Sequence, residues 1–234
     1  VMDYIHNHKE ISNVILSGGD ALMLPTKTLA RYLFALAEME HLDLIRIATR
    51  IPVVLPTRIT EDTELQDALR SYGRKKQIYV VTQFNHPREL TEKSVAAVRV
   101  LRECGMVVKN QTVLLKGVND DPAILGSLLR KLTACGAAPY YVFQCRPVTG
   151  VKSSFQVSLS LGYDIVEGAK AMQNGQGKCL KYCMSHPRGK IEIAGKLEDG
   201  AMLFKFHQAK HNHDAGRIFT RKLPKEETWL PDSL

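Results

Sequence analysis

Short apolar runs alternate with longer amphipathic stretches along most of this 234-residue chain. Apolar, β-branched runs bounded by turn residues predict buried strands, whereas apolar positions spaced three or four residues apart predict helices. The expected strands are 14–17, 44–49, 78–83, 107–115 and 139–145. The expected helices are 26–38, 62–71, 91–104, 122–135 and 158–172.

This order of elements predicts an α/β fold. Strands that alternate with helices of this length pair in parallel through right-handed crossovers, so the sheet is either doubly wound or closed toward a barrel. Alternation in "AMLFKF", after the turn at 198–200, predicts a further strand pair. We therefore expect one main domain over residues 1–195 and a small, β-containing, basic C-terminal extension over residues 196–234, with Trp229 holding the terminus.

Polar residues follow several of the expected strands. In "NVILSGGDALML" a strand ends on Gly18 and Gly19, which permit a sharp turn and close approach of a ligand, and Asp20 then faces the opening. A local cap of the next turn is the alternative role of Asp20. In parallel α/β folds, ligands bind where the carboxyl ends of the strands meet. We therefore expect a binding site formed by 17–20, Arg50, 83–86, 110–111 and 144–146.

The composition, with 44% hydrophobic and 24% charged residues, is ordinary for a soluble protein. The chain has neither an apolar stretch long enough for a membrane span nor a signal peptide at its start. Its five cysteines lack a disulfide framework, so reduced thiols and a cytoplasmic location are expected. The net charge of +8 is concentrated in 205–225, but the absence of interleaved aromatic residues argues against nucleic-acid binding.

Five segments resemble the lysine 2,3-aminomutase family of radical S-adenosylmethionine enzymes. In chain order they are "ILSGGDAL", "RIATRIPVVLPTRIT", "TQFNHPRELTEKS", "NQTVLLKGVNDD" and "APYYVFQCRPVTGV". The resemblance implies a partial parallel (β/α) barrel that holds a [4Fe-4S] cluster, S-adenosylmethionine and pyridoxal phosphate. It also implies an isomerase that moves an amino group between adjacent carbons of a small amino-acid substrate.

Several residues are assigned a cofactor role by this resemblance. Gly18, Gly19 and Asp20 correspond to the segment that meets the methionyl amino group of S-adenosylmethionine. An ammonium needs acceptors, and bare carbonyl groups beside a carboxylate supply them. Gln111 corresponds to a position near the ribose, and Gln83 stands where lysine-specific members carry histidine. We therefore expect all five residues to contact the cofactor.

Lys190 resembles the lysine that forms the internal aldimine with pyridoxal phosphate. The family has a longer glycine run and then Lys-Thr-Pro, whereas this chain has one glycine before Lys190 and Ile-Glu after it. A surface lysine is the alternative. We expect Lys190 to carry the cofactor because it follows the last barrel strand.

Arg146 stands where lysine-using members have an aspartate that holds the distal ammonium of the substrate. The family's second aspartate aligns with Ser185 or His186, neither of which is acidic. A guanidinium here should reject lysine and can hold a carboxylate in a bidentate pair. An acidic substrate such as glutamate is therefore predicted, and a salt bridge from Arg146 to a neighbouring loop is the alternative.

The family's cluster motif, CxxxCxxC, precedes the stretch that begins here, and nothing like it occurs before Asp20. We expect the cluster ligands to lie outside this chain. Cys179, Cys183 and His186 form CxxxCxxH but are expected after the last barrel strand. A zinc ion there would need a fourth ligand, such as His207, His211 or His213. We predict no metal site in this chain.

The sequence thus predicts an aminomutase-like enzyme that depends on S-adenosylmethionine and pyridoxal phosphate. Two alternatives remain open. One is a radical S-adenosylmethionine enzyme of a different reaction type, in which Lys190 has another role. The other is a non-catalytic binding protein that uses its basic C-terminal extension. The sequence leaves open whether the protein is a homo-oligomer.

Overall fold

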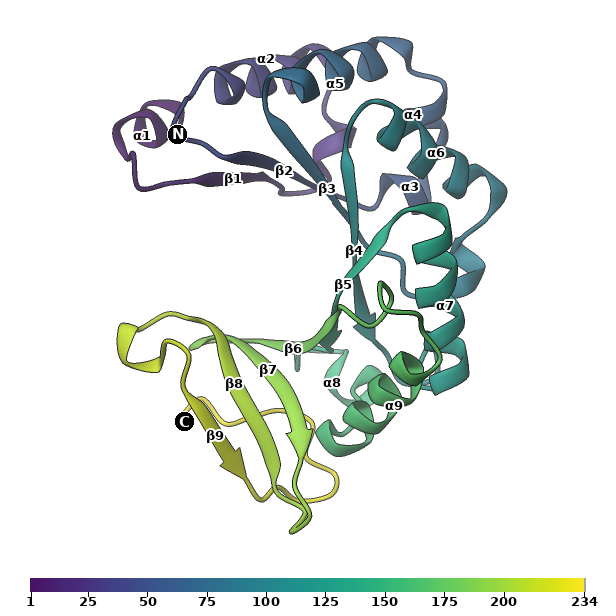
Figure 1. Ribbon diagram of the computed structural model, residues 1–234, viewed down its shortest axis with the longest axis vertical. Helices are drawn as coiled ribbons and strands as arrows, with labels where there is room; N and C mark the ends of the chain where they lie inside the picture. The colour runs from purple at the N-terminus through teal and green to yellow at the C-terminus, as the bar shows by residue number, and fades with distance from the viewer. Residues whose placement is uncertain (234) are drawn as a thin grey trace. The chain divides into compact units, whose positions relative to one another are not determined.

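The computed structural model describes residues 1–233, except for the side chains of residues 152 and 153. Its strands lie in chain order in the sheet (Figure 1): β1 (Asn13–Leu16), β2 (Leu44–Thr49), β3 (Gln77–Thr82), β4 (Val107–Leu114), β5 (Ala138–Gln144), β6 (Lys181–His186), β7 (Gly189–Lys196), β8 (Met202–Ala209) and β9 (Ile218–Arg221).

The α-helices are α1 (Met2–Asn7), α2 (Thr26–Ala37), α3 (Ile51–Val54), α4 (Thr57–Thr60), α5 (Thr63–Lys75), α6 (Glu92–Glu103), α7 (Pro122–Cys135), α8 (Lys152–Phe155) and α9 (Leu159–Ala171). Short 3-10 helices occur at η1 (Ala21–Met23), η2 (Pro87–Glu89) and η3 (Asn212–Asp214). Within the described residues, no helix is both long and apolar enough to cross a bilayer.

The pairing of the strands confirms the predicted α/β class. Strands β1 to β4 pair in parallel, and β5 pairs in parallel with β6. Strands β6 to β9 pair antiparallel, so the predicted strand pair around the turn at 198–200 is also confirmed as β7 and β8. Contacts divide the chain into two compact units. Unit 1 contains residues 1–84, 88–110 and 132–138, and unit 2 contains residues 85–87, 111–131 and 139–234.

In unit 1, helices α2 and α5 pack together over one face of the β1–β3 sheet (Figure 1). Strand β2 shows the resulting alternation, because Ile45 and Ile47 are fully buried whereas Arg46 between them is only half-buried. Helix α5 begins at Asp62, whose carboxylate accepts a hydrogen bond from the Leu65 amide at 2.7 Å. The second face of the sheet therefore carries the Arg46 side chain.

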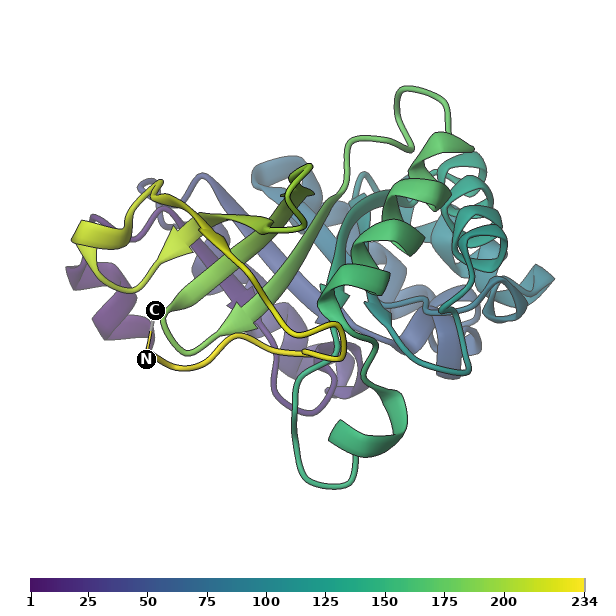
Figure 2. The same cartoon turned by 90° about the horizontal axis from the view of Figure 1, so that it is seen from below.

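In unit 2, helices α7 and α9 lie side by side (Figures 1 and 2). Glycines permit this approach, because a Cβ on Gly126 would lie 2.3 Å from the Met172 side chain and one on Gly168 would lie 3.1 Å from Pro122. The Gln173 amide, beyond the end of α9, donates to the Gly126 carbonyl at 3.0 Å. The two helices form one layer of the unit.

The C-terminal segment is held against the ends of β5 and β6. The buried Gln144 amide donates to the carbonyls of Val157 and Thr228 at 2.7 and 2.8 Å. The Trp229 ring stacks on the His186 ring with centroids 6.3 Å apart. The prediction that Trp229 holds the terminus is therefore confirmed.

Candidate functional site

Asp20 joins the carboxyl ends of β1 and β2 in unit 1. One carboxylate oxygen accepts hydrogen bonds from the Leu22 amide at 3.1 Å and the Thr49 hydroxyl at 2.6 Å. The other oxygen accepts from the Arg50 amide at 2.6 Å. Asp20 therefore caps η1, as the alternative assignment from the sequence expected, and also fixes the two strand ends against each other. A carboxylate has about four acceptor positions, so these bonds do not exhaust it.

Gly18 and Gly19 make the turn that precedes Asp20. Their φ angles are 96° and 61°, in the left-handed region where residues with a Cβ are strained. A Cβ at either position would meet no atom within 4 Å, so backbone conformation rather than crowding accounts for glycine here.

The Asp20 bonds lead to a stability prediction. Asp20→Ala should lower the free energy of unfolding by about 2–3 kcal/mol, because two buried amides and a hydroxyl lose a charged acceptor. Thr49→Val removes one of these bonds and should have a smaller effect. Urea unfolding followed by circular dichroism measures both variants. An unchanged midpoint in Asp20→Ala would show that the three bonds are not stabilising.

Gln83 directly follows β3 in unit 1 and is half-buried. The turn that holds it is fixed by Asn110 on β4, whose side chain accepts from the Phe84 amide at 2.7 Å and donates to the Phe84 carbonyl at 3.1 Å. Within the described residues the Gln83 amide makes no hydrogen bond. Its donor and acceptor groups are therefore available to a ligand.

Gln111 lies on β4 in unit 2 and is also half-buried. The adjacent loop is fixed by Asn119, whose amide donates to the carbonyls of Asn85 and Val113 at 2.7 and 2.8 Å. Asn85 in turn accepts from the Val113 amide at 2.9 Å. The Gln111 amide forms no hydrogen bond to the described part of the chain. The Gln111 side chain thus lies on a strand whose adjacent loop is held by hydrogen bonds of Asn85 and Asn119.

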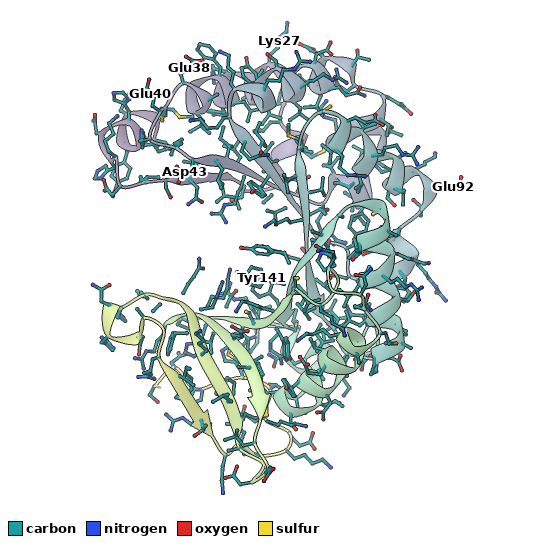
Figure 3. All side chains as sticks on the ribbon, in the orientation of Figure 1. Lys27, Glu38, Glu40, Asp43, Glu92 and Tyr141 are labelled. Carbon is teal, nitrogen blue, oxygen red and sulfur yellow. The ribbon has the colours of Figure 1, made fainter. Side chains whose placement is uncertain are left out.

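Lys190 lies on β7 in unit 2, over two aromatic rings of β5. Its Nζ is 4.1 Å from the centroid of Tyr141 and 5.5 Å from that of Phe143. Figure 3 shows Tyr141 on the face of β5 that points away from α7. Strand pairing places Lys190 opposite Ser185 on β6. The amine therefore lies on the helix-free face of this part of the sheet, supported by aromatic carbon.

The single glycine before Lys190 has a packing role. Gly189 has a φ of 142°, and a Cβ there would lie only 2.1 Å from the Gln208 carbonyl oxygen of β8. The close approach of the two backbones requires glycine. Lys190 consequently projects from a strand, not from the loop that a longer glycine run would form.

Tyr141 and His207 form a hydrogen-bonded pair beside Lys190. From the sequence, His207 was considered only as a possible zinc ligand and Tyr141 was not selected. The Tyr141 hydroxyl lies 2.7 Å from His207 Nε2. Burial raises the pKa of Tyr141. Burial lowers the pKa of His207, and the charges of Lys181 and Lys190 lower it further. Near pH 7 the tyrosine is therefore the donor and the neutral imidazole is the acceptor.

The other lysines of this region are paired with carboxylates. Lys181 lies 2.6 Å from Glu192. Lys196 lies 2.5 Å from Asp164. The contacts of Lys190 with the two rings of β5 are therefore the feature that supports its assignment.

Arg146 follows β5 directly and is exposed. The backbone before it is fixed, since the buried Gln156 amide donates to the Cys145 carbonyl at 2.7 Å. Within the described residues the Arg146 guanidinium makes neither an ion pair nor a side-chain hydrogen bond. The salt bridge to a neighbouring loop, expected as an alternative, is therefore not formed there.

Two basic residues of the C-terminal extension, Arg217 and Lys222, form ion pairs within unit 2. Arg188 lies 2.5 Å and Arg217 lies 3.0 Å from the fully buried Asp214 carboxylate. Burial alone would raise the pKa of Asp214, but the charges and hydrogen bond of the two arginines outweigh it and hold that pKa below its usual value. Lys222 pairs with Asp199 at 3.1 Å. These three cations therefore have carboxylate partners within the fold.

Strand β6 was not expected from the sequence, and it changes the position of two candidate ligands. Cys183 and His186 lie on β6, which pairs in parallel with β5, and not after the last parallel strand as predicted. Residues three apart on a strand point to opposite faces. The described residues contain no group of three side chains able to hold a metal ion.

The chain is similar to curated 2,3-aminomutases. It is 39% identical over 233 residues to a putative L-lysine 2,3-aminomutase of Aquifex aeolicus, covering 99% of this chain and 62% of that protein. It is 36% identical over 188 residues to a glutamate 2,3-aminomutase of Clostridioides difficile, covering 80% of this chain and 43% of the relative. The chain thus spans less than two thirds of either relative.

The chain was also compared with protein-family models and with solved structures. No family model matches the chain. A solved radical SAM methyltransferase of Sphaerobacter thermophilus is similar with a TM-score of 0.40 and 18% identity, covering 67% of this chain and 55% of the methyltransferase chain.

Proposed function

Because the chain belongs to the lysine 2,3-aminomutase family, we propose that it serves a radical S-adenosylmethionine enzyme that moves an amino group between adjacent carbons of an amino acid. The observation that carries the proposal is the position of Lys190. Its amine lies on the rings of Tyr141 and Phe143, on a strand that fixes its direction. A planar aromatic aldehyde attached at Lys190 would meet rings able to stack with it.

The residues suit both organic cofactors. Lys190 would hold pyridoxal phosphate, with Tyr141 and Phe143 beside it. In unit 1, the Gly18 to Asp20 turn would offer acceptors for the ammonium of S-adenosylmethionine, and Gln83 would offer a side-chain amide. A contact of Gln111, in unit 2, with the ribose stays a prediction from the family resemblance. In such an enzyme S-adenosylmethionine supplies the radical that removes a hydrogen atom, and pyridoxal phosphate carries the migrating nitrogen.

The protein's own contribution is orientation and exclusion of competing reactions. Asp20 keeps the Gly18–Gly19 turn against the end of β2, so its peptide groups keep a fixed direction. The Tyr141–His207 pair keeps a neutral imidazole near Lys190 at pH 7. A protonated imidazole there would add a cation beside two lysines.

For the substrate, we propose an acidic amino acid such as glutamate. Arg146 supports this choice because its exposed guanidinium forms no ion pair within the described residues and follows a strand whose end is fixed. Such a group holds a carboxylate in a bidentate pair and repels an ammonium. A glutamate 2,3-aminomutase is also among the relatives.

The test is product analysis with the full-length protein under anaerobic conditions, using ¹³C-labelled glutamate and lysine. The proposal expects a β-amino acid whose formation requires both S-adenosylmethionine and pyridoxal phosphate. Cleavage of S-adenosylmethionine without any dependence on pyridoxal phosphate would instead support a different radical reaction. Salt-sensitive binding to nucleic acid without turnover would support the binding-protein alternative.

A further inference from the structure

Arg46 is a cation in the middle of a strand, and no described residue supplies a counter-charge for it. Its neighbours along β2, Ile45 and Ile47, are fully buried beneath the helices, so Arg46 lies on the other face of the unit 1 sheet. Its Nε is buried and has no hydrogen-bond partner. The described residues provide neither an ion pair nor a hydrogen bond for its guanidinium. Native proteins rarely leave such a donor unsatisfied.

The neighbouring strand positions make this face aromatic and positively charged. Arg46 pairs across the sheet with Ile15 on β1 and with Tyr79 on β3. The Nζ of Lys109, on β4, lies 5.1 Å from the centroid of the Tyr79 ring. Because β3 lies between β2 and β4, the tyrosine is flanked by the two strands that carry the cations.

We propose that Arg46, together with Tyr79 and Lys109, forms a binding site for the oxyanion of a small molecule. The Nε and one terminal nitrogen of a guanidinium form the edge that accepts a carboxylate or phosphate through two parallel hydrogen bonds. That edge contains the unpartnered Nε of Arg46. Lys109 adds positive charge, and the Tyr79 ring offers a surface for the planar part of a ligand.

Three molecules of the proposed reaction carry an oxyanion that could bind at this site. The methionyl carboxylate of S-adenosylmethionine, the phosphate of pyridoxal phosphate and the α-carboxylate of an amino acid are all suitable oxyanions. The site is argued from unit 1 alone and does not depend on an amino shift. Binding can therefore succeed while the proposed reaction fails, or the reverse.

The experiment compares ligand pairs that differ only in the oxyanion, by equilibrium dialysis against the 234-residue chain. The pairs are S-adenosylmethionine and its decarboxylated form, pyridoxal phosphate and pyridoxal, and glutamate and its α-amide. In at least one pair the oxyanion should improve binding by about tenfold or more, as expected for charge-assisted hydrogen bonds. Arg46→Met should remove this preference, and Arg46→Lys should retain part of it.

Arg99→Met is the matched control, because Arg99 is an exposed arginine on α6 of the same unit. It should leave the preference unchanged, and circular dichroism should show each variant folded. The pair that loses its preference in Arg46→Met identifies the source of the oxyanion. The proposal is overturned if the wild-type chain shows no preference in any pair, or if Arg46→Met retains it.

Discussion

Lys190→Ala should reduce borohydride-stable attachment of pyridoxal phosphate to this chain to background. The reason is local. The Lys190 amine lies over two aromatic rings, 4.1 Å from the centroid of Tyr141, on the helix-free face of β5 and β7. Attachment requires an amine that can reach the aldehyde carbon, and strand β7 fixes the position of Lys190 beside rings able to stack with a planar cofactor. The measurement is borohydride reduction followed by peptide mapping of the modified lysine.

Two other lysines of unit 2 provide matched controls, because Lys181 is the first residue of β6 and Lys196 is the last residue of β7. Lys181→Ala, which removes the partner of Glu192, should leave the modification of Lys190 in place. Lys196→Ala, which removes the partner of Asp164, should do the same. Modification of either lysine in the wild-type chain in place of Lys190 would refute the assignment. Circular dichroism of Lys190→Ala separates loss of attachment from loss of folding.

The sequence predicted the fold where periodicity and turn chemistry agreed. Helix α7 and strand β2 have the predicted bounds, since each is a strongly apolar segment between clear turn signals. Strand β6, "KYCMSH", was missed because polar residues interrupt its apolar positions and its strand character depends on pairing with β5 and β7. Residues 181–186 form a strand because of pairing with other strands, which the sequence of a single segment does not encode.

The candidate site was predictable only in part, for a related reason. Gly18, Gly19 and Asp20 are adjacent in sequence, so their turn and cap could be inferred locally. Tyr141 and His207 are 66 residues apart, and the bulged pairing of β7 with β8 brings that histidine to the face of β5. No local pattern marks such a pair.

Gly189 shows a different limit. Its sequence position suggested a shortened version of a glycine loop, whereas its backbone approaches β8 so closely that a Cβ would lie 2.1 Å from a carbonyl oxygen. The presence of glycine at position 189 is thus explained by the packing of β7 against β8 and not by a loop. Only the register of β7 against β8 distinguishes these two roles.

Arg146→Asp should weaken binding of glutamate by about tenfold, equivalent to about 1.5 kcal/mol, and should relax the exclusion of lysine. We place the effect at the lower end for a charge-assisted pair because the guanidinium is exposed, and solvent screens such pairs. Glutamate should lose more than lysine gains. In Arg146→Asp the side-chain carboxylate of glutamate loses its guanidinium partner and meets the negative charge of the aspartate. Recognition of lysine would also need an acidic group near Ser185 or His186.

The measurement is the dissociation constant of each amino acid from the full-length protein loaded with pyridoxal phosphate, followed by the change in cofactor absorbance. Arg146→Lys is the conservative control, because it keeps the charge but loses the bidentate geometry, and it should retain part of the glutamate affinity. The discrimination between glutamate and lysine should therefore decrease in the order wild type, Arg146→Lys, Arg146→Asp. If glutamate binds Arg146→Asp as tightly as wild type, the side chain does not face the substrate. The specificity must then come from other residues, and the acidic-substrate assignment fails even if the amino shift itself is observed.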